Sequence, residues 1–268
     1  KIENWLWEKM GLEKSRHLVA SRDDYGWEQE VTEAECKCTK EIKEYYYRCG
    51  AECCLTYVLG MTDIHMDNVI AHGKYPVIID TEFMFDRRIE VGTQGKNLQQ
   101  NLMDTVMHTG FVPNGMGTMH VNVSVLNTCD EQRLSVKMPM VINKGTSEMN
   151  ISYHYPKLSH KKNMLIYEGK YISFENYMNE FISGFRRAYD CIKADPEVLV
   201  GMCQPIMKKK VRYLFRNTQE YYMYITSSNF PELMRNQAKR QLSLWHMDRG
   251  LYCNEAYRVK ILTYEMQC

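Results

Sequence analysis

A chain of 268 residues is long enough to bury a sizeable core, as one large domain or two modest ones. Apolar residues make up 44% of it, charged residues 25% and aromatic residues 12%, which excludes disordered and fibrous proteins. The formal net charge of +1 creates no overall attraction to nucleic acid, and no apolar run approaches the roughly 18 residues of a membrane-spanning helix. The chain begins at Lys1 without a signal region, so we expect a cytoplasmic piece of a longer protein.

The ten cysteines are spaced irregularly along the chain. They form neither an even disulfide framework nor a pair of C-x-x-C knuckles at zinc-finger separation. We therefore expect reduced thiols, most of them buried as small hydrophobic residues.

The first half of the chain predicts a helix, a hairpin and a further strand. Apolar residues recur at helical spacing over residues 40–59, and Gly60 is suited to end that helix. After a loop over 61–67, the apolar runs 69–71 and 76–79 flank a short turn and predict a β-hairpin. Alternation over 119–125 predicts a strand with four apolar side chains on one face: Met119, Val121, Val123 and Val125.

The second half of the chain is predicted to be mostly helical. Residues 143–162 are polar without a period and predict a loop. A helix is expected from Phe174 until Asp195-Pro196, and another from near Pro231 past Leu244 and Trp245. The stripe of the first helix predicts core residues: Phe174, Tyr177, Met178, Phe181, Ile182, Phe185, Tyr189 and Ile192. This order of elements favours the α+β class.

The residues that carry chemistry lie around the predicted hairpin. Asp63 and Asn68 are five apart on the loop before it, and Asp80 ends its second strand. Because a hairpin returns its far end to where it started, we expect Asp80 to lie near Asn68. A carboxylate that contacts a hydroxyl, with an Asn and an Asp that hold Mg²⁺ through oxygen, is typical of phosphoryl transfer. The kinase catalytic loop has the same step from Asp to Asn.

Two other interpretations of these patterns stay open at this point. A metal hydrolase would use Asp63, His65 and Asp80, with His72 as an optional fourth ligand, although the sequence has no H-E-x-x-H helix. The basic run over residues 208–216, taken on its own, is explained equally well as a solvent-exposed face and as a functional site. It contains Lys208, Lys209, Lys210, Arg212 and Arg216.

The region over 45–85 resembles the dehydratase domain of class II lanthipeptide synthetases, the LanM type. The resemblance rests on Arg48-Cys49-Gly50, Thr62-Asp63-Ile64-His65, Asn68 and Tyr75-Pro76-Val77-Ile78-Ile79-Asp80-Thr81-Glu82. It extends over most of the chain through Tyr25-Gly26-Trp27, Gly184-Phe185 with Tyr189, and Val211-Arg212-Tyr213-Leu214-Phe215-Arg216-Asn217-Thr218 with Tyr221. Asn217 stands where the family commonly has Pro.

The resemblance implies a lipid-kinase-like fold, with a small β-hairpin and a mostly helical C-terminal part. It implies that ATP and Mg²⁺ serve to phosphorylate Ser and Thr of a precursor peptide, which has a leader and a core, and that the phosphate is then eliminated. Asp63 would orient or deprotonate the substrate hydroxyl, and Asn68 and Asp80 would hold the metal. His65 and Glu82 would support the phosphorylation site, Glu82 on the cofactor side. Arg212 and Thr218 would serve elimination.

Under this interpretation the whole chain is part of one dehydratase domain. Residues 1–150 would form the catalytic-loop region, and residues 151–268 a mainly helical region with the elimination motif. The family's ATP-contacting Lys and its zinc cyclase are expected outside this chain. The alternatives are a small-molecule kinase of the aminoglycoside or choline type, and a non-catalytic peptide-binding remnant. The elimination motif favours the dehydratase over the simple kinase.

Overall fold

The computed structural model describes residues 1–15, 17–23, 25–85, 105–113, 121–126, 132–158, 162–209 and 218–244. The chain divides into two compact units, one of residues 1–86 with 97–209 and one of residues 87–96 with 210–268. The helices of the first unit are α1 (Ile2–Met10), α2 (Thr39–Val58), η1 (Val106–Thr109), η2 (Phe174–Tyr177), α4 (Met178–Ala194) and α5 (Pro196–Met207). The described part of the second unit holds α6 (Thr218–Ser228), α7 (Pro231–Met234) and α8 (Gln237–Leu244).

Strands of the described residues pair only two by two, and every pair is antiparallel. The pairs are β1 (Val19–Ser21) with β2 (Gly26–Glu28), β3 (Val69–His72) with β4 (Tyr75–Ile78), β5 (Gln132–Arg133) with β8 (Lys157–Leu158), β6 (Met138–Ile142) with β7 (Asn150–His154), and β9 (Ile166–Tyr167) with β10 (Lys170–Tyr171). The structure is thus a mixture of helices and small sheets, and its likeness to a kinase stays a prediction.

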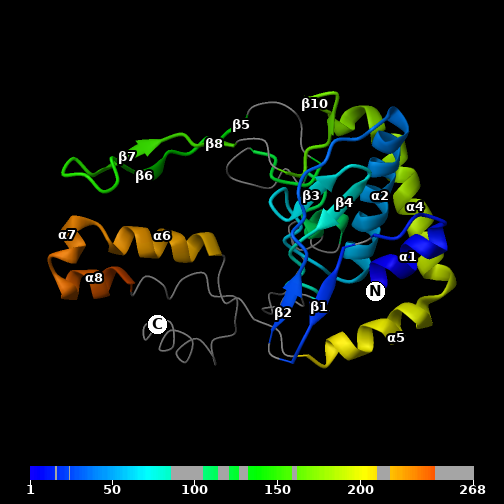
Figure 1. Cartoon of the computed structure of the whole chain (residues 1–268). Helices are drawn as coiled ribbons and strands as arrows, with labels where there is room; N and C mark the ends of the chain where they lie inside the picture. Colours follow the sequence, from blue (N-terminus) through cyan, green and yellow to red (C-terminus); the bar gives the residue numbers. More distant parts are fainter. Residues whose placement is uncertain are drawn as a thin grey trace. The chain divides into compact units, whose positions relative to one another are not determined.

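The helix predicted over residues 40–59 is α2, the central element of the first unit. It ends where Gly60 takes a φ of 59°, a left-handed conformation that glycine adopts without strain. Figure 1 shows α4 running beside α2. The two helices approach closely at Gly50 and Gly184, because a Cβ atom on either glycine would overlap the backbone of the other helix.

We predict that Gly184→Ala strongly destabilises the first unit. The added Cβ would lie 1.8 Å from the backbone oxygen of Tyr47, so a helix must move, and overpacking of this kind costs about 1–3 kcal/mol or more. The matched control is Gly201→Ala on α5, where no atom lies within 4 Å of the added Cβ. That change should raise the free energy of unfolding by roughly 0.5–1 kcal/mol. Urea unfolding of both variants measures the two effects, and equal stabilities would contradict the close helix contact.

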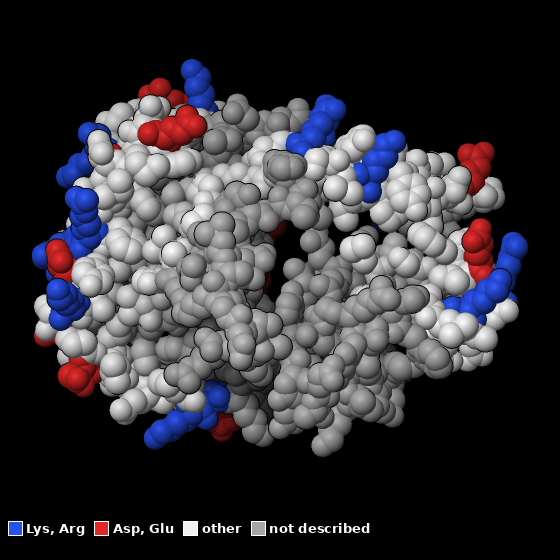
Figure 2. All heavy atoms as spheres, turned by 180° about the vertical axis from the view of Figure 1, so that it is seen from behind, with Lys and Arg blue, Asp and Glu red and all other residues white. Residues whose placement is uncertain are grey.

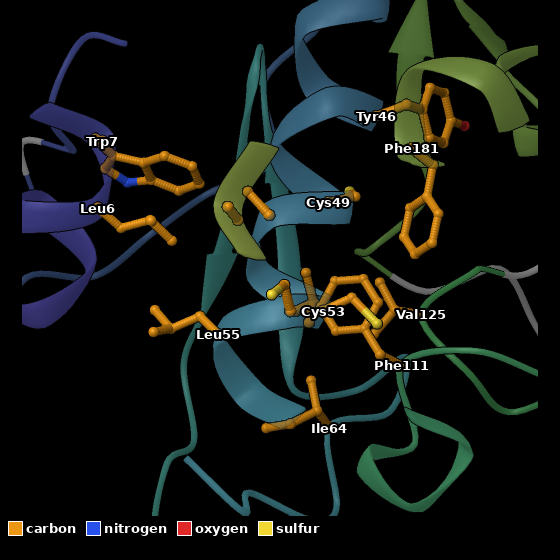
Figure 3. Packing of buried hydrophobic residues seen from close by; sticks show 14 of the residues in the cluster. Leu6, Trp7, Tyr46, Cys49, Cys53, Leu55, Ile64, Phe111, Val125 and Phe181 are labelled. Carbon is orange, nitrogen blue, oxygen red and sulfur yellow. The ribbon is translucent and has the colours of Figure 1, made fainter. Parts of the chain in front are cut away.

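The hydrophobic core lies where α1, α2 and α4 meet the loops that follow the β3–β4 hairpin. Figure 3 shows Leu6 and Trp7 on one side of α2, with Phe111 and Val125 on the other. The rings of Phe111 and Phe181 have their centroids 6.4 Å apart. The loops that carry Phe111 and Val125 thus belong to the core around α2. Their neighbours Thr109 and Val123 accept backbone hydrogen bonds from the segment that follows Asp63.

The stripe predicted for residues 174–192 is only partly the buried face. Phe181 and Ile192 are buried as expected, but Ile182 and Tyr189 are 39% and 48% exposed. The buried face of α4 instead follows its small residues, because only these allow the close approach to α2; it consists of Phe181, Gly184, Ala188, Cys191 and Ile192. The helix ends before Pro196, as predicted, and α5 begins there.

The strand predicted over residues 119–125 is wrong for the part that the structure describes. Residues 121–126 contain one isolated bridge, at Ser124, and Val123 is 46% exposed whereas Val125 is buried. The side-chain oxygen of Asn122 accepts a hydrogen bond from the backbone N–H of Ser124 (3.0 Å), which bends the chain out of a regular strand. Met119 lies outside the described residues.

Two further predictions need correction. Residues 143–162 are not a continuous loop, since β7 (150–154) pairs with β6, and β8 pairs with β5. The helix predicted from Pro231 is divided into α7 and α8, because the side chain of Asn236 accepts a hydrogen bond from the backbone N–H of Lys239 and caps a new helix. Trp245 lies outside the described residues.

A buried charge network joins α1, α2 and the β3–β4 hairpin. The Arg48 side chain is fully buried. Its Cζ atom lies 4.9 Å from the ring centroid of Trp7 and 4.7 Å from the ring centroid of Tyr75. Oε1 of Glu44 accepts a hydrogen bond from Nη2 of Arg48 at 2.8 Å, and the same oxygen lies 3.3 Å from Nζ of Lys74. Since a buried charge is stable only with partners of this kind, the network fixes the turn end of the hairpin to both helices.

Glu52 lies in the same region, and burial together with the neighbouring Glu3 carboxylate raises its pKa well above 4.5. The folded protein therefore binds a proton at Glu52 that the unfolded chain releases above pH 4.5. Stability contributed by this proton is present at low pH and is lost as the pH rises toward the folded pKa. We predict that Glu52→Gln removes this decline, so the variant becomes more stable than wild type on raising the pH. Chemical unfolding at a series of pH values tests it, and parallel curves would contradict it.

Every cysteine in the described part of the chain is a free thiol, and all of these except Cys38 are buried. This confirms the prediction for those residues. None of the described helices combines the length and the apolar character needed to cross a membrane.

Candidate active site

The β3–β4 hairpin brings Asp80 next to Asn68, as the sequence predicts. Val69 pairs with Ile78 at the open end of the hairpin, and one step farther the backbone N–H of Ile79 donates to the carbonyl oxygen of Asn68 at 3.0 Å. Asp80 is the next residue. Two positions twelve apart in sequence therefore stand side by side, one on each chain of the hairpin.

The loop that carries Asp63 is held by backbone hydrogen bonds on both sides. The N–H of Ile64 donates to the carbonyl of Thr109 at 2.8 Å, and the N–H of Met66 donates to that of Val123 at 2.9 Å. Before Asp63, the N–H of Thr62 donates to the carbonyl of Phe83 at 3.2 Å. Asp63 itself has a φ of 64°, a conformation that a non-glycine residue adopts only when its surroundings impose it. The loop is thus fixed with the Asp63 side chain, about half exposed, beside the hairpin end.

Gly110 is a supporting residue that the sequence analysis missed. Its φ is 84°, and a Cβ atom there would lie 3.0 Å from the backbone oxygen of Ile64. A side chain at this position would therefore push the Asp63 loop away. The single available signal was a glycine after a polar segment, and sequence spacing alone does not connect it with Asp63.

His65 is oriented by its own loop. Its Nδ1 accepts a hydrogen bond from the backbone N–H of Asp67 at 3.1 Å, so the proton of the neutral ring is on Nε2. Nε2 lies 3.6 Å from Oδ1 of Asp63. This places a donor against the carboxylate that the sequence predicts to be catalytic, and it fits the supporting role predicted for His65.

The pKa of the Asp63 carboxyl is raised above its usual value of 3.8. Burial is the largest cause, and the charge of Asp80 raises the pKa further, whereas His65 lowers it. The effect of the Asp80 charge on Asp63 agrees with the hairpin, which places Asp80 beside the loop of Asp63. A raised pKa makes Asp63 a stronger base than an ordinary surface aspartate.

Asn68 and Asp80 offer the oxygen atoms that Mg²⁺ prefers. Nδ2 of Asn68 donates to the carbonyl oxygen of Asp63 at 2.9 Å, which leaves its Oδ1 without a hydrogen-bond partner among the described residues. Oδ1 of Asp80 accepts from the backbone N–H of Glu82 at 3.2 Å, and Oδ2 likewise has no partner in the described parts. The donor set therefore fits a hard divalent cation that takes its remaining ligands from phosphate and water.

The hydrolase interpretation fails on geometry. His72 pairs with Tyr75 at the turn of the hairpin, the opposite end from Asp80, and its Nδ1 lies 2.7 Å from the carbonyl oxygen of Thr32. Nor do any three His, Cys, Asp or Glu side chains of the described residues converge as a metal site. A cavity of about 500 Å³ also lies at this turn, lined by His72, Lys74 and Tyr75 among others, and so belongs to the end away from Asp63.

The predicted elimination residues belong to the second unit. Arg212 lies outside the described residues, and Thr218 is the first residue of α6. Of the basic run, Lys208 and Lys209 are exposed at the end of α5, and the rest lies outside the described residues. The roles of Arg212 and Thr218 stay predictions.

The described surface carries charged side chains of both signs on the face that is opposite to the view of Figure 1. Figure 2 shows Lys and Arg side chains interspersed with Asp and Glu over the described part of that face. This mixture agrees with the net charge of +1.

Comparisons with known proteins support the family that the motifs predicted. A family model described as a domain of unknown function (DUF4135) matches residues 2–268. The chain is also 27% identical over 257 residues to the lacticin 481/lactococcin biosynthesis protein LcnDR2 of Lactococcus lactis subsp. lactis. That alignment covers 88% of this chain and 27% of the relative, so the chain spans about a quarter of the relative's length. This chain belongs to the DUF4135 family, the domain found in class II (LanM-type) lanthipeptide synthetases.

Proposed function

We propose that this chain is the catalytic part of a lanthipeptide dehydratase, which uses ATP and Mg²⁺ to phosphorylate Ser and Thr of a precursor peptide and then eliminates the phosphate. The observation that carries the proposal is the meeting of Asp63, His65, Asn68 and Asp80 at one end of the β3–β4 hairpin. Its similarity to a lacticin 481 biosynthesis protein supports a role in lanthipeptide maturation. The proposed place of reaction is the cytoplasm, where ATP is available.

In the first half-reaction, Asp63 accepts the proton of the substrate hydroxyl. The hydroxyl oxygen forms a bond to the γ-phosphorus as the bond from that phosphorus to the leaving ADP oxygen breaks. His65, whose Nε2 lies 3.6 Å from Oδ1 of Asp63, would orient that carboxylate. Asn68 and Asp80 would hold the metal, with Glu82 as a support of Asp80. Bound Mg²⁺ supplies neutralisation of the charge on the phosphates.

In the second half-reaction, the phosphoserine or phosphothreonine loses its α-proton to a base. The Cα–Cβ double bond forms as the Cβ–O bond breaks and phosphate departs. The planar guanidinium of Arg212 is suited to the departing phosphate, because it donates two parallel hydrogen bonds to its oxygens. Thr218 is proposed to act with Arg212 in this step.

Transfer of label from ATP tests the proposal. The intact protein is incubated with Mg²⁺, γ-labelled ATP and a Ser- and Thr-containing precursor peptide. We expect label to pass first to the peptide and then to inorganic phosphate, as the peptide loses water. Label that stays on the peptide indicates a protein kinase, and label on an added aminoglycoside or choline indicates a small-molecule kinase. Either result would contradict dehydration.

A further inference from the structure

The loop that carries His65 is held by a segment that is distant from it in the sequence. His65 stands opposite Ser124 in an isolated antiparallel bridge, and the backbone N–H of Met66 donates to the carbonyl oxygen of Val123 at 2.9 Å. Opposite residues of an antiparallel pair lie close together. The position of the His65 ring therefore depends on the shape of residues 122–126.

One side chain gives this segment its shape. Oδ1 of Asn122 accepts hydrogen bonds from the backbone N–H of Ser124 at 3.0 Å and from the hydroxyl of the same residue at 2.6 Å. Nδ2 of Asn122 donates to the carbonyl oxygen of Leu126 at 2.9 Å. The carboxamide thus closes the turn from residue 122 to residue 126, and it uses its acceptor and its donor at once to do so.

Two further carboxamides supply hydrogen bonds of the kind that a neighbouring strand would supply. The side chain of Gln132 accepts from the backbone N–H of Asn122 at 2.6 Å and donates to its carbonyl oxygen at 3.1 Å. Nδ2 of the buried Asn163 donates to the carbonyl oxygen of Val125 at 2.8 Å. Since Ser124 and Val125 are themselves buried, an unpaired backbone group here would be costly. Side chains therefore fix the backbone of this segment.

We infer that Asn122 is a positioning residue of the candidate site: its carboxamide fixes residues 122–126, and these hold His65 where its Nε2 lies 3.6 Å from Oδ1 of Asp63. Asn122 acts through the backbone of Val123 and Ser124. A displaced His65 leaves the Asp63 carboxylate without the group that orients it toward the substrate hydroxyl. The importance of Asn122 for phosphoryl transfer rests on the proposed function.

Phosphorylation of a precursor peptide by the intact protein tests this inference. Asn122→Asp keeps the size and the acceptor of the side chain, but it places an oxygen against the carbonyl of Leu126 where the donor was. We expect kcat to fall by about ten- to a hundredfold with little change in KM for ATP, because a misplacement of about 1 Å lowers a rate up to a hundredfold. The matched control is Asn143→Asp, which also removes a donor to a backbone carbonyl, that of Glu148 at 3.4 Å, but in the turn after β6. This control should keep the wild-type kcat.

A double-mutant cycle separates positioning from a loss of folded protein. If Asn122 acts through His65, Asn122→Asp lowers kcat in the wild-type background but not further in the His65→Ala background. Gln132→Glu, which loses the donor to the carbonyl oxygen of Asn122, should behave in the same way, and it decides the question if Asn122→Asp does not fold. Urea unfolding gives the folded fraction of each variant. An unchanged kcat, a kcat that falls only with the folded fraction, or an equal fall in both backgrounds would overturn the inference.

Chemical modification of His65 separates this inference from the proposed function, because it requires no activity. Diethyl pyrocarbonate acylates accessible imidazole nitrogens, and mass spectrometry of the digested protein gives the rate at each histidine. Asn122→Asp should raise the rate at His65 several-fold and leave unchanged the rate at His72, which lies at the far end of the hairpin. If the rate at His65 rises but the wild type never phosphorylates a peptide, the proposed function fails and the positioning by Asn122 stands. If the wild type phosphorylates its peptide and the rate at His65 is the same in Asn122→Asp, the positioning fails and the function stands.

Discussion

Asp80→Asn in the intact enzyme is expected to abolish both phosphate gain and water loss on a precursor peptide, and Asp63→Asn is expected to do the same. Asp80 is proposed to hold a divalent cation together with Asn68, and Asp63 is the proposed base, whose pKa is raised. Loss of a positioned general base alone lowers a rate by about 10²–10⁴-fold. Mass spectrometry of the peptide after incubation with ATP and Mg²⁺ measures the result.

Asp67→Asn is the matched control for these two changes. Asp67 lies in the same loop, but its carboxylate is on the far side of His65, with Oδ2 3.8 Å from Nδ1. It should keep most of the activity, because the Nδ1 hydrogen bond comes from the backbone of Asp67 rather than from its side chain. Water loss at a near wild-type rate in Asp80→Asn would disprove the metal assignment.

The second large effect is an uncoupling of the two half-reactions. Arg212→Ala or Thr218→Ala in the intact enzyme should leave phosphoryl transfer working and stall elimination. Removing one donor to a developing anion costs on the order of a hundredfold or more in rate, enough for the intermediate to accumulate. Mass spectrometry should then find peptide that is heavier by about 80 Da per site, the mass added by phosphorylation, where wild type gives dehydrated peptide.

Lys208→Ala and Lys209→Ala serve as controls, because both residues are exposed in the same basic run. If they behave like Arg212→Ala, the run acts through its total charge and the specific role of Arg212 is wrong. Unmodified peptide from both Arg212→Ala and Thr218→Ala would instead assign the segment to folding or to nucleotide binding.

Local patterns predicted α2 and the β3–β4 hairpin because both depend on short-range information. The helical spacing of α2 and the turn at Gly73, where φ is 57°, depend on residues that are close to one another in the sequence. The alternation over residues 119–125 predicted a strand wrongly, because the side-chain oxygen of Asn122 accepts a hydrogen bond from the backbone N–H of Ser124. The face of α4 was misplaced for a different reason: close packing against α2 favours Gly184 and Ala188, which a hydrophobic stripe ignores.

The candidate site was predictable to the same extent. Asp63, Asn68 and Asp80 meet through one hairpin, and the sequence contains that connection. Gly110 and Thr109 approach the loop from a segment more distant in the chain, where no spacing rule applies. The tautomer of His65 depends on a backbone hydrogen bond that becomes visible only in three dimensions.

The stacking of Arg48 between Trp7 and Tyr75 joins α1, α2 and the β3–β4 hairpin, so we expect them to unfold together. If α1 separated from α2, the Arg48 guanidinium would lose one of its two aromatic contacts, and its stacking on Tyr75 would weaken, which leaves the Glu44–Lys74 pair to hold the turn of the hairpin to α2. Local opening of the first ten residues would then loosen Asp80 at the other end of the same two strands. The slowly exchanging amides of α1 and of β3 should therefore exchange in a single opening event, and substitutions that loosen α1 should also weaken the proposed phosphoryl transfer.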